Sequence, residues 1–449
     1  MTKNNNKIGF VEKAAYGGLN IGNIPIMSLI NGYLLIFYTN ICGMDPKACA
    51  TLFLIARILD ALNDPLVGFC IDRMPNTRFG HFRPTLIAGT ILCSLNFLLL
   101  WFGPMMAPSG KLVIAYISYL LIGVMFPIMD ISLNSLLPVM TTDMNERQKL
   151  SAIKGFVYMA GSVVLGIVAP LVLGDTSNRD GYIVLIIGAT IIIFVCSILG
   201  VFGVKERVTK QAGAAPYTIK DLFRILTQKP VLITFISLLV FTIGNNIQST
   251  VSAYFFTYII GDLTLSSAAS LLSFVGLIIT TILSVKAVQM KGKKTVYLFG
   301  FLVAAAAFAL RLISPANVPL LMVSSFIMGL GAGFISTLNY SIQADNTDYI
   351  ELKLGMRAEA GISALSSFSS KFAAGIGGAL PGYVLGFAGF DSTLAVQTET
   401  VNNMIIVCQI VAPITFFAIG FAVFAKGYTI TQEKLDEQNR LLAERRAGK

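Results

Sequence analysis

The sequence predicts an all-α membrane protein with twelve transmembrane helices in two six-helix pseudo-repeat halves. The 449 residues are 55% hydrophobic and only 12% charged, and the mean hydropathy is +0.75. These values exclude an ordinary soluble domain. Apolar runs of about 20 residues or more recur along the whole chain, and each is long enough to cross a bilayer as a helix. One long hydrophilic connection divides these runs six and six, which indicates a repeated architecture.

The apolar runs set the order of the elements. We expect spans at residues 17–40, 49–72, 84–104, 112–138, 151–173, 182–204, 230–260, 266–288, 295–314, 318–343, 358–388 and 402–426. The chain then divides into an N-terminal half at 1–204, a cytoplasmic linker at 205–229, a C-terminal half at 230–426 and a cytoplasmic tail at 427–449. An even number of spans puts both termini on the same side of the membrane.

Lysine and arginine residues decide which side that is. The termini and the loops after the even-numbered spans are basic, whereas the opposite loops hold only Lys47, Lys111 and Arg179. Basic loops stay in the cytoplasm, so we expect both termini there, in a multi-pass protein of the cell (inner) membrane. The same loops account for the net charge of +10, so no nucleic-acid partner is expected.

The first span is polar for a membrane helix. It carries Asn20, Asn23, Ser28 and Asn31, and no small-residue cleavage site follows it. We therefore expect a retained helix that lines something polar, not a signal peptide. The six cysteines lie mostly in or beside apolar spans without metal-ligand spacing, so we expect neither disulfides nor a metal centre from them.

The second span places charges inside an apolar run. Arg57, Asp60 and Asp64 are spaced i, i+3 and i+7 and share one helix face, and Asn63 lies beside them. A charge at the bilayer centre costs roughly 2.5 kcal/mol or more, so such residues usually serve an ion or substrate path. Two carboxylates and an amide suit Na⁺ or a proton. The alternative is a salt-bridge network that only holds helices together.

Three later spans also carry polar residues in their apolar runs. Asp130 lies in the fourth span, and Lys371 follows a serine-rich stretch that includes Ser367 in the eleventh. A lysine in mid-span needs a carboxylate, carbonyls or an anionic ligand nearby, and Asp130 is the expected partner of Lys371. Lys154 begins the fifth span and either lines the cavity or extends to the membrane surface.

Basic turns follow the second and the eighth spans. The first turn runs from Asp72 to Pro84 and includes Arg83, and Lys286 to Lys294 form a weaker counterpart. Both turns are interpreted as a faint internal repeat whose charges latch helices together in one conformation, or else as a plain topology signal.

Several of these stretches together resemble one family. They are residues 38–43, 57–65, 78–84, 128–130, 344–361 and 368–371. In them the chain resembles the glycoside–pentoside–hexuronide:cation symporters, a branch of the major facilitator superfamily typified by the melibiose permeases. The likeness runs nearly end to end, and it implies the major facilitator fold and cation-coupled sugar transport.

The resemblance implies roles for individual residues. Asp60 and Asp64 match the paired carboxylates that hold the coupling cation, as metal ligands if that cation is Na⁺. Asn63 matches the residue that tunes cation choice, and Asp130 and Lys371 match the polar centre that joins the cation and sugar sites. The remaining substrate-binding candidates are Lys154, Asn134, Ser336 and Ser367. The coupling or conformational candidates are Arg57, Asp72, Arg83, Asp348 and Arg357.

The chain departs from the galactoside-binding permeases at four positions. Ile24 stands where they place an aspartate that grips the sugar, and Asn134 and Ser336 stand where they place tryptophans that stack on it. Pro127 replaces a threonine that helps to hold Na⁺. These departures argue against a melibiose-like disaccharide as the substrate.

The charges left in the cavity favour a smaller polar sugar or an acidic one. Lys371 and Lys154 favour a ligand with negative charge, balanced by co-transported cations. Asp130 argues the other way, because it can neutralise Lys371 and still hydrogen-bond a neutral sugar.

The leading hypothesis is therefore a secondary active symporter for a sugar, glycoside or sugar acid, driven by Na⁺ or H⁺ and working as a monomer in the lipid bilayer. No P-loop is present, so ATP does not drive it and no resident cofactor is expected. An enzyme is not expected, because the single histidine, His81, lies in a turn and no nucleophile–base set is visible. The alternatives are a transporter of a lipid-like amphipathic substrate and a membrane sensor that does not translocate its ligand.

Overall fold

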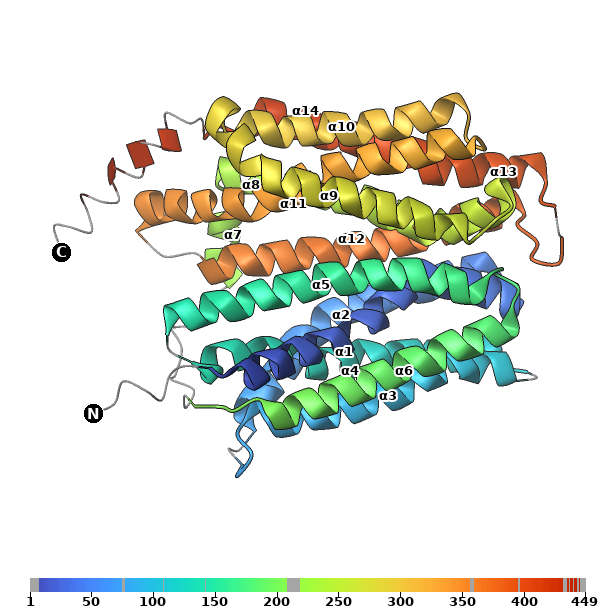
Figure 1. Ribbon diagram of the computed structural model, residues 1–449, viewed down its shortest axis with the longest axis horizontal. Coiled ribbons are helices and arrows are strands. Elements are labelled where there is room, and N and C mark those ends of the chain that lie inside the picture. The colour runs from blue at the N-terminus through green and yellow to red at the C-terminus, as the bar shows by residue number, and fades with distance from the viewer. Residues whose placement is uncertain are drawn as a thin grey trace. The chain divides into compact units, whose positions relative to one another are not determined.

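The computed structural model is almost entirely helical over the residues it describes (Figure 1). These are residues 8–74, 77–107, 109–141, 143–207, 219–355, 359–394 and 396–430, together with 434–435, 437–438, 440–441 and 444 in the tail. The chain forms two compact units, and each is described by itself.

Unit 1 comprises residues Met1–Ala214 with two later segments, Asp262–Ser267 and Gly382–Gln397. Its helices are α1 (Phe10–Ile36), η1 (Phe37–Ile41), α2 (Pro46–Arg73), α3 (Phe82–Met106), α4 (Lys111–Met140), α5 (Met144–Leu173) and α6 (Arg179–Gly203). α1 packs against α5 and α6, α3 against α4 and α6, and α2 against α4. A buried aromatic cluster holds one end together, where the ring of Phe37 lies 4.9 Å from the rings of Trp101 and Tyr182.

Unit 2 comprises Ala215–Gly261, Ala268–Pro381 and Thr398–Lys449. Its helices are α7 (Ile219–Leu226), α8 (Lys229–Tyr254), η2 (Phe255–Ile260), α9 (Leu265–Lys291), α10 (Lys293–Ile313), α11 (Val318–Leu354), α12 (Glu359–Ala388), α13 (Glu399–Ile406), η3 (Val407–Val411) and α14 (Ala412–Gly427), of which α9 and α12 extend into segments of unit 1. α10 packs against α11 and α14, and α8 packs against α14. Phe241, Phe301 and Phe417 form its aromatic core.

Each span expected from the sequence overlaps a long helix in the described part of the chain. Ten of these helical segments are long and apolar enough to cross a membrane. The two long helices outside that set are α2 and α12, which carry Arg57, Asp60 and Lys371 in their middle turns. Both of these helices therefore carry candidate site residues.

The linker expected at 205–229 contains a helix that the sequence analysis did not predict. α7 is short and amphipathic, and its Ile225 is buried with Val231, Ile350 and Ile362 of unit 2. A short helix is unstable alone in water, and this apolar contact stabilises it. The connection is therefore partly folded onto unit 2.

Two π-helical segments share a sequence pattern and a backbone shape. η1 and η2 end the first long helix of each unit, and both read Phe-x-Thr-x-Ile-x-Gly, at residues 37–43 and 255–261. Gly43 and Gly261 have φ of 65° and 84°, which a side chain with a Cβ adopts only with strain. This match is a clearer internal repeat than the two basic turns, and it relates the first helices of the two units.

Candidate functional site

A polar network joins three helices in the middle of unit 1. Asn23 of α1 donates from Nδ2 to Asp130 Oδ1 of α4 at 2.7 Å, and the same atom lies 2.8 Å from the Tyr158 hydroxyl of α5. Asn134, one turn after Asp130, donates to its other carboxylate oxygen at 3.0 Å. Lys154 of α5 donates from Nζ to Asn134 Oδ1. The structure thus brings together three predicted substrate-binding residues, Asp130, Asn134 and Lys154.

Helix geometry explains why these side chains meet. Asp130 and Asn134 are spaced i, i+4 on α4, and Lys154 and Tyr158 have the same spacing on α5, so each pair shares a face. The ammonium of Lys154 lies 5.8 Å from the centre of the Tyr158 ring and points toward α4. Both oxygens of Asp130 accept an amide hydrogen bond, which offsets part of the cost of a carboxylate inside a span.

The charged face of α2 has its own partners. Arg57 Nη1 lies 3.3 Å from Asp60 Oδ2, and Arg57 Nη2 donates to Asn31 Oδ1 of α1 at 3.3 Å. Asp60 Oδ1 lies so close to Gly123 of α4 that a Cβ at this glycine would overlap it. The Arg57 and Asp60 side chains are only 11% and 13% exposed, so the pair is largely withdrawn from solvent.

The rest of the predicted cation site is less fully described. Asn63 lies half-buried on α2, whereas the side chain of Asp64 is outside the described residues. Among the residues that the structure does describe, no group of three or more His, Cys, Asp and Glu side chains could hold a metal ion. The carboxylate pair with an adjoining amide therefore stays a prediction.

The candidates in unit 2 lie on α11 and α12. Lys371 and Ser367 are on an exposed face of α12, Ser336 is exposed on α11, and Asp348 is half-buried on α11. The predicted bridge from Lys371 to Asp130 stays a prediction, and the described partners of Asp130 are Asn23 and Asn134. Arg357 lies outside the described residues.

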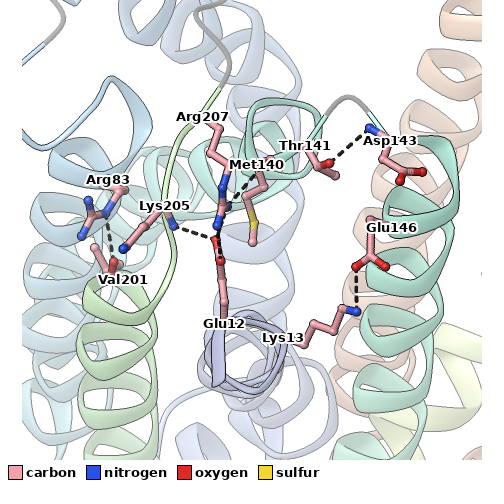
Figure 2. A network of polar contacts seen from close by, with 10 residues as sticks. All are labelled: Glu12, Lys13, Arg83, Met140, Thr141, Asp143, Glu146, Val201, Lys205 and Arg207. Atoms are coloured by element: carbon pink, nitrogen blue, oxygen red, sulfur yellow. Dashed lines mark hydrogen bonds and ion pairs between the residues drawn. The ribbon is translucent and has the colours of Figure 1, made fainter. Parts of the chain in front are cut away.

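The turn between α2 and α3 is held by hydrogen bonds to the backbone among the described residues. Arg83 Nε donates to the Val201 carbonyl of α6 at 3.0 Å (Figure 2). Its Nη1 donates to the Phe79 carbonyl at 3.3 Å. Among the described residues, this guanidinium contacts backbone carbonyls. Such contacts supply hydrogen bonds to carbonyls that lack a partner at the ends of helices. The side chain of Asp72 is outside the described residues. The carboxylate of Glu206 also holds this turn. It accepts hydrogen bonds from the backbone N–H groups of His81, Phe82 and Arg83 at 2.8–2.9 Å.

Two ion pairs near the ends of α1, α5 and α6 were not predicted. Glu12 of α1 accepts from Arg207 at 2.6 and 2.7 Å, and Glu146 of α5 lies 2.6 Å from Lys13 (Figure 2). Hydrogen bonds from Lys13 and Lys149 lower the pKa of Glu146 to about 2. These pairs connect α1 to α5 and to residues 204–207, which follow α6.

Sequence reasoning left Tyr158 and Asn23 out of the site. Asn23 had a signal, since an amide inside an apolar span needs a partner, and Tyr158 lies one turn after Lys154. Ile24 is only 5% exposed and packs so closely on Gly161 of α5 that a Cβ there would overlap it. In the structure Ile24 is a packing residue, and its neighbour Asn23 presents the polar group.

The chain matches known transporters over most of its length. The model of the family described as MFS/sugar transport protein matches residues 15–432. The isoprimeverose transporter of Lactiplantibacillus pentosus is 32% identical over 88% of this chain and 84% of its own. From Escherichia coli, a putative glycoside/cation symporter is 26% identical (92% and 90% covered), and a glucuronide carrier protein homolog is 28% identical (90% and 89% covered).

The fold has solved counterparts. The crystal structure of the nucleoside transporter NupG matches with a TM-score of 0.68 over 92% of this chain and 99% of that one, at 14% identity. At this identity the match concerns the fold alone, and together with the family match it identifies the major facilitator fold. The family model matches residues 15–432, and the relatives include an isoprimeverose transporter, a putative glycoside/cation symporter and a glucuronide carrier homolog. The chain is therefore a transporter, not an enzyme, and belongs to the MFS/sugar transport protein family, in its glycoside–pentoside–hexuronide:cation symporter branch.

Proposed function

We propose that this protein is a secondary active symporter that couples uptake of a sugar, glycoside or sugar acid to Na⁺ or H⁺ by alternating access. The observation that carries the proposal is the network of Asn23, Asp130, Asn134, Lys154 and Tyr158 inside apolar helices. It offers amide, hydroxyl, carboxylate and ammonium groups, which suit a ligand rich in hydroxyl groups. A lipid-like substrate would need an apolar surface at this place.

The coupling cation is assigned to the charged face of α2. Asp60 already pairs with Arg57, and Asp64 is one turn further along the same face. Two carboxylates one turn apart repel each other, and binding a cation or a proton relieves that repulsion. The cation is co-transported, so no resident cofactor takes part. The protein is proposed to act as a monomer in the inner membrane with both termini in the cytoplasm.

The substrate is proposed to carry a negative charge. Asp130 accepts hydrogen bonds from Asn23 and Asn134, whereas Lys154 donates to a neutral amide oxygen and keeps two further N–H donors. The ammonium is therefore better placed than the carboxylate to meet a ligand. The glucuronide carrier homolog supports this choice, while the isoprimeverose transporter supports a neutral sugar.

Uptake into proteoliposomes tests the proposal. A methyl glucoside and the matching methyl glucuronide differ only at C6, so their competition against each other isolates the charge. We expect accumulation under an imposed Na⁺ or H⁺ gradient, with the glucuronide preferred at least tenfold, and with that preference lost in Lys154→Gln. Equal uptake of both sugars would contradict the charge assignment. Gradient-independent uptake of either sugar would contradict symport, and binding without any uptake would favour the sensor.

A further inference from the structure

A small cavity in unit 2 is separate from the network that we assign to transport. Its volume is about 160 Å³, and it lies where α9 meets α10. Lys291, Lys293 and Lys294 line it together with one carboxylate, Asp345. Among the described lining residues, three ammonium groups and one carboxylate leave an excess of two positive charges.

Two of the three lysines are held in place. Lys293 Nζ lies 2.7 Å from each carboxylate oxygen of Asp345, so these two charges cancel. Lys294 Nζ donates to the Tyr428 carbonyl at 2.8 Å, which fixes its position, and the described residues accept no bond from its other two N–H groups. Lys291 is exposed at the rim of the cavity. The excess charge therefore comes from Lys291 and Lys294.

The backbone adds further donors at the same place. α10 begins directly after Gly292, and among the described residues no side chain accepts a hydrogen bond from its first N–H groups. The first N–H groups of a helix have no acceptor within the helix, and its N-terminus favours negative charge. Gly292, Lys293, Lys294 and Thr295 all line the cavity, so these N–H groups and the lysines surround one space.

The other unit shows what such a helix start binds. α3 is the third long helix of unit 1, as α10 is of unit 2, and the first helices of the units share the Phe-x-Thr-x-Ile-x-Gly segment. At the start of α3, the carboxylate of Glu206 accepts three backbone N–H groups. At the start of α10, the described residues supply no such carboxylate, and a basic cavity lies there instead.

We propose that this cavity binds a phosphate group, carried by an anionic lipid headgroup or present as a free ion. Helix N-termini and lysine clusters both recognise phosphate, and basic pockets between membrane helices hold anionic headgroups. Met290 and Phe299, which flank the cavity-lining segment in sequence, are 78% and 53% exposed and offer apolar surface that suits acyl chains. The site is independent of the proposed transport reaction.

Binding to the full-length protein tests this. Delipidated protein is titrated with phosphatidylglycerol, with phosphatidylcholine and with inorganic phosphate, and bound ligand is measured by native mass spectrometry and by the shift in unfolding temperature. Lys291→Gln and Lys294→Gln each remove one cavity charge. Lys286→Gln is the matched control, because Lys286 is exposed on α9 outside the cavity and the charge change is the same.

We expect saturable binding that Lys291→Gln and Lys294→Gln each weaken at least fivefold and that Lys286→Gln leaves unchanged. Binding of phosphatidylglycerol but not of inorganic phosphate identifies a lipid headgroup as the source, and the reverse identifies a soluble phosphate. Equal effects of all three substitutions, or no saturable binding of either anion, would overturn the proposal. Lys291 makes no hydrogen bond or ion pair among the described residues, so a folding defect is not expected from Lys291→Gln.

Discussion

Asp130 shows at the scale of a residue how a membrane helix tolerates a carboxylate. Asn23 and Asn134 each donate to one of its oxygens, from a different helix and from the next turn of the same helix. A carboxylate without such donors is costly to bury, and pairing it with hydrogen-bond donors removes much of that cost. The same two amides orient the carboxylate, so the position of each polar atom is defined before a substrate arrives.

We predict that Asp60 and Asp64 carry the coupling. Asp60→Asn and Asp64→Asn each keep the shape of the side chain but remove a charge, so the cation is no longer held. Gradient-driven accumulation should be abolished, while downhill exchange of substrate is retained. Asp45→Asn on the same helix is the control, since Asn also caps a helix start. Normal concentrative uptake by a folded Asp64→Asn variant would rule out this assignment.

We predict that Lys371 is required both for transport and for stability. A lysine in mid-span is retained only where its charge is used, and removing it leaves carboxylates uncompensated. Lys371→Ala should lose uptake and unfold at a lower temperature, whereas Lys426→Ala, at an exposed lysine in the last turn of α14, should do neither. Uptake kinetics of Lys371→Ala equal to those of the parent would show that Lys371 lies on a solvated face.

At the scale of the element, helix ends are stabilised by residues from distant segments. Glu206 caps α3 across more than a hundred residues of sequence, and Lys111 Nζ donates to the Cys42 carbonyl just after η1 at 2.7 Å. Helix ends expose unpaired N–H and C=O groups that must find partners. Loops that look like plain topology signals therefore also fix the ends of the helices in unit 1.

We predict that Glu206→Ala destabilises unit 1 by roughly 2 kcal/mol, because three backbone donors lose a charged acceptor. The unfolding temperature in detergent measures the loss. Glu399→Ala is the control, since Glu399 is an exposed acid in the first turn of α13. An equal, small shift in both variants would show that the cap contributes little.

We predict a pH dependence from the contact between α1 and α5. The pKa of Glu146 falls from its ordinary 4.5 to about 2 because Lys13 and Lys149 donate to it. The folded state thus binds this proton less readily than the unfolded state. The contact stabilises the protein fully above pH 4.5, and the stabilisation disappears as the pH falls toward 2. The stability difference between the parent and Glu146→Gln should shrink over that range, and a difference independent of pH would contradict it.

At the scale of the molecule, two units with matching first helices are the framework expected for alternating access. η1 and η2 share their sequence pattern, their π-helical backbone and a terminal glycine with positive φ. Such a match is expected of two units that descend from a repeated ancestor. Short π-helical turns are rare and frequently lie at functional sites.

We predict that both termini face the cytoplasm. An epitope at the C-terminus should resist protease in intact cells and be cleaved in inside-out vesicles, because the basic loops stay inside. An epitope inserted between residues 174 and 178, in the loop after α5, should show the opposite pattern and is the control. Cleavage of the C-terminal epitope in intact cells would reverse the orientation.

The sequence by itself determined the fold class, the family and which spans carry polar chemistry. Hydrophobicity is a local property, so runs of apolar residues and the charges within them can be read along the chain. Asp130 and Lys154 stood out because a charge in an apolar span needs a partner. Asn23 was visible as an unusual amide, although its partner was not.

Only the tertiary structure decided the partners. Tyr158 joined the network, Ile24 became a packing residue against Gly161, and Glu206 capped a helix that begins more than a hundred residues earlier. The linker helix α7 formed because Ile225 meets apolar residues of α8, α11 and α12. These outcomes depend on how each helix is rotated and shifted against its neighbours. Contacts between segments far apart in the chain set this rotation and shift, and a local sequence pattern does not record such contacts.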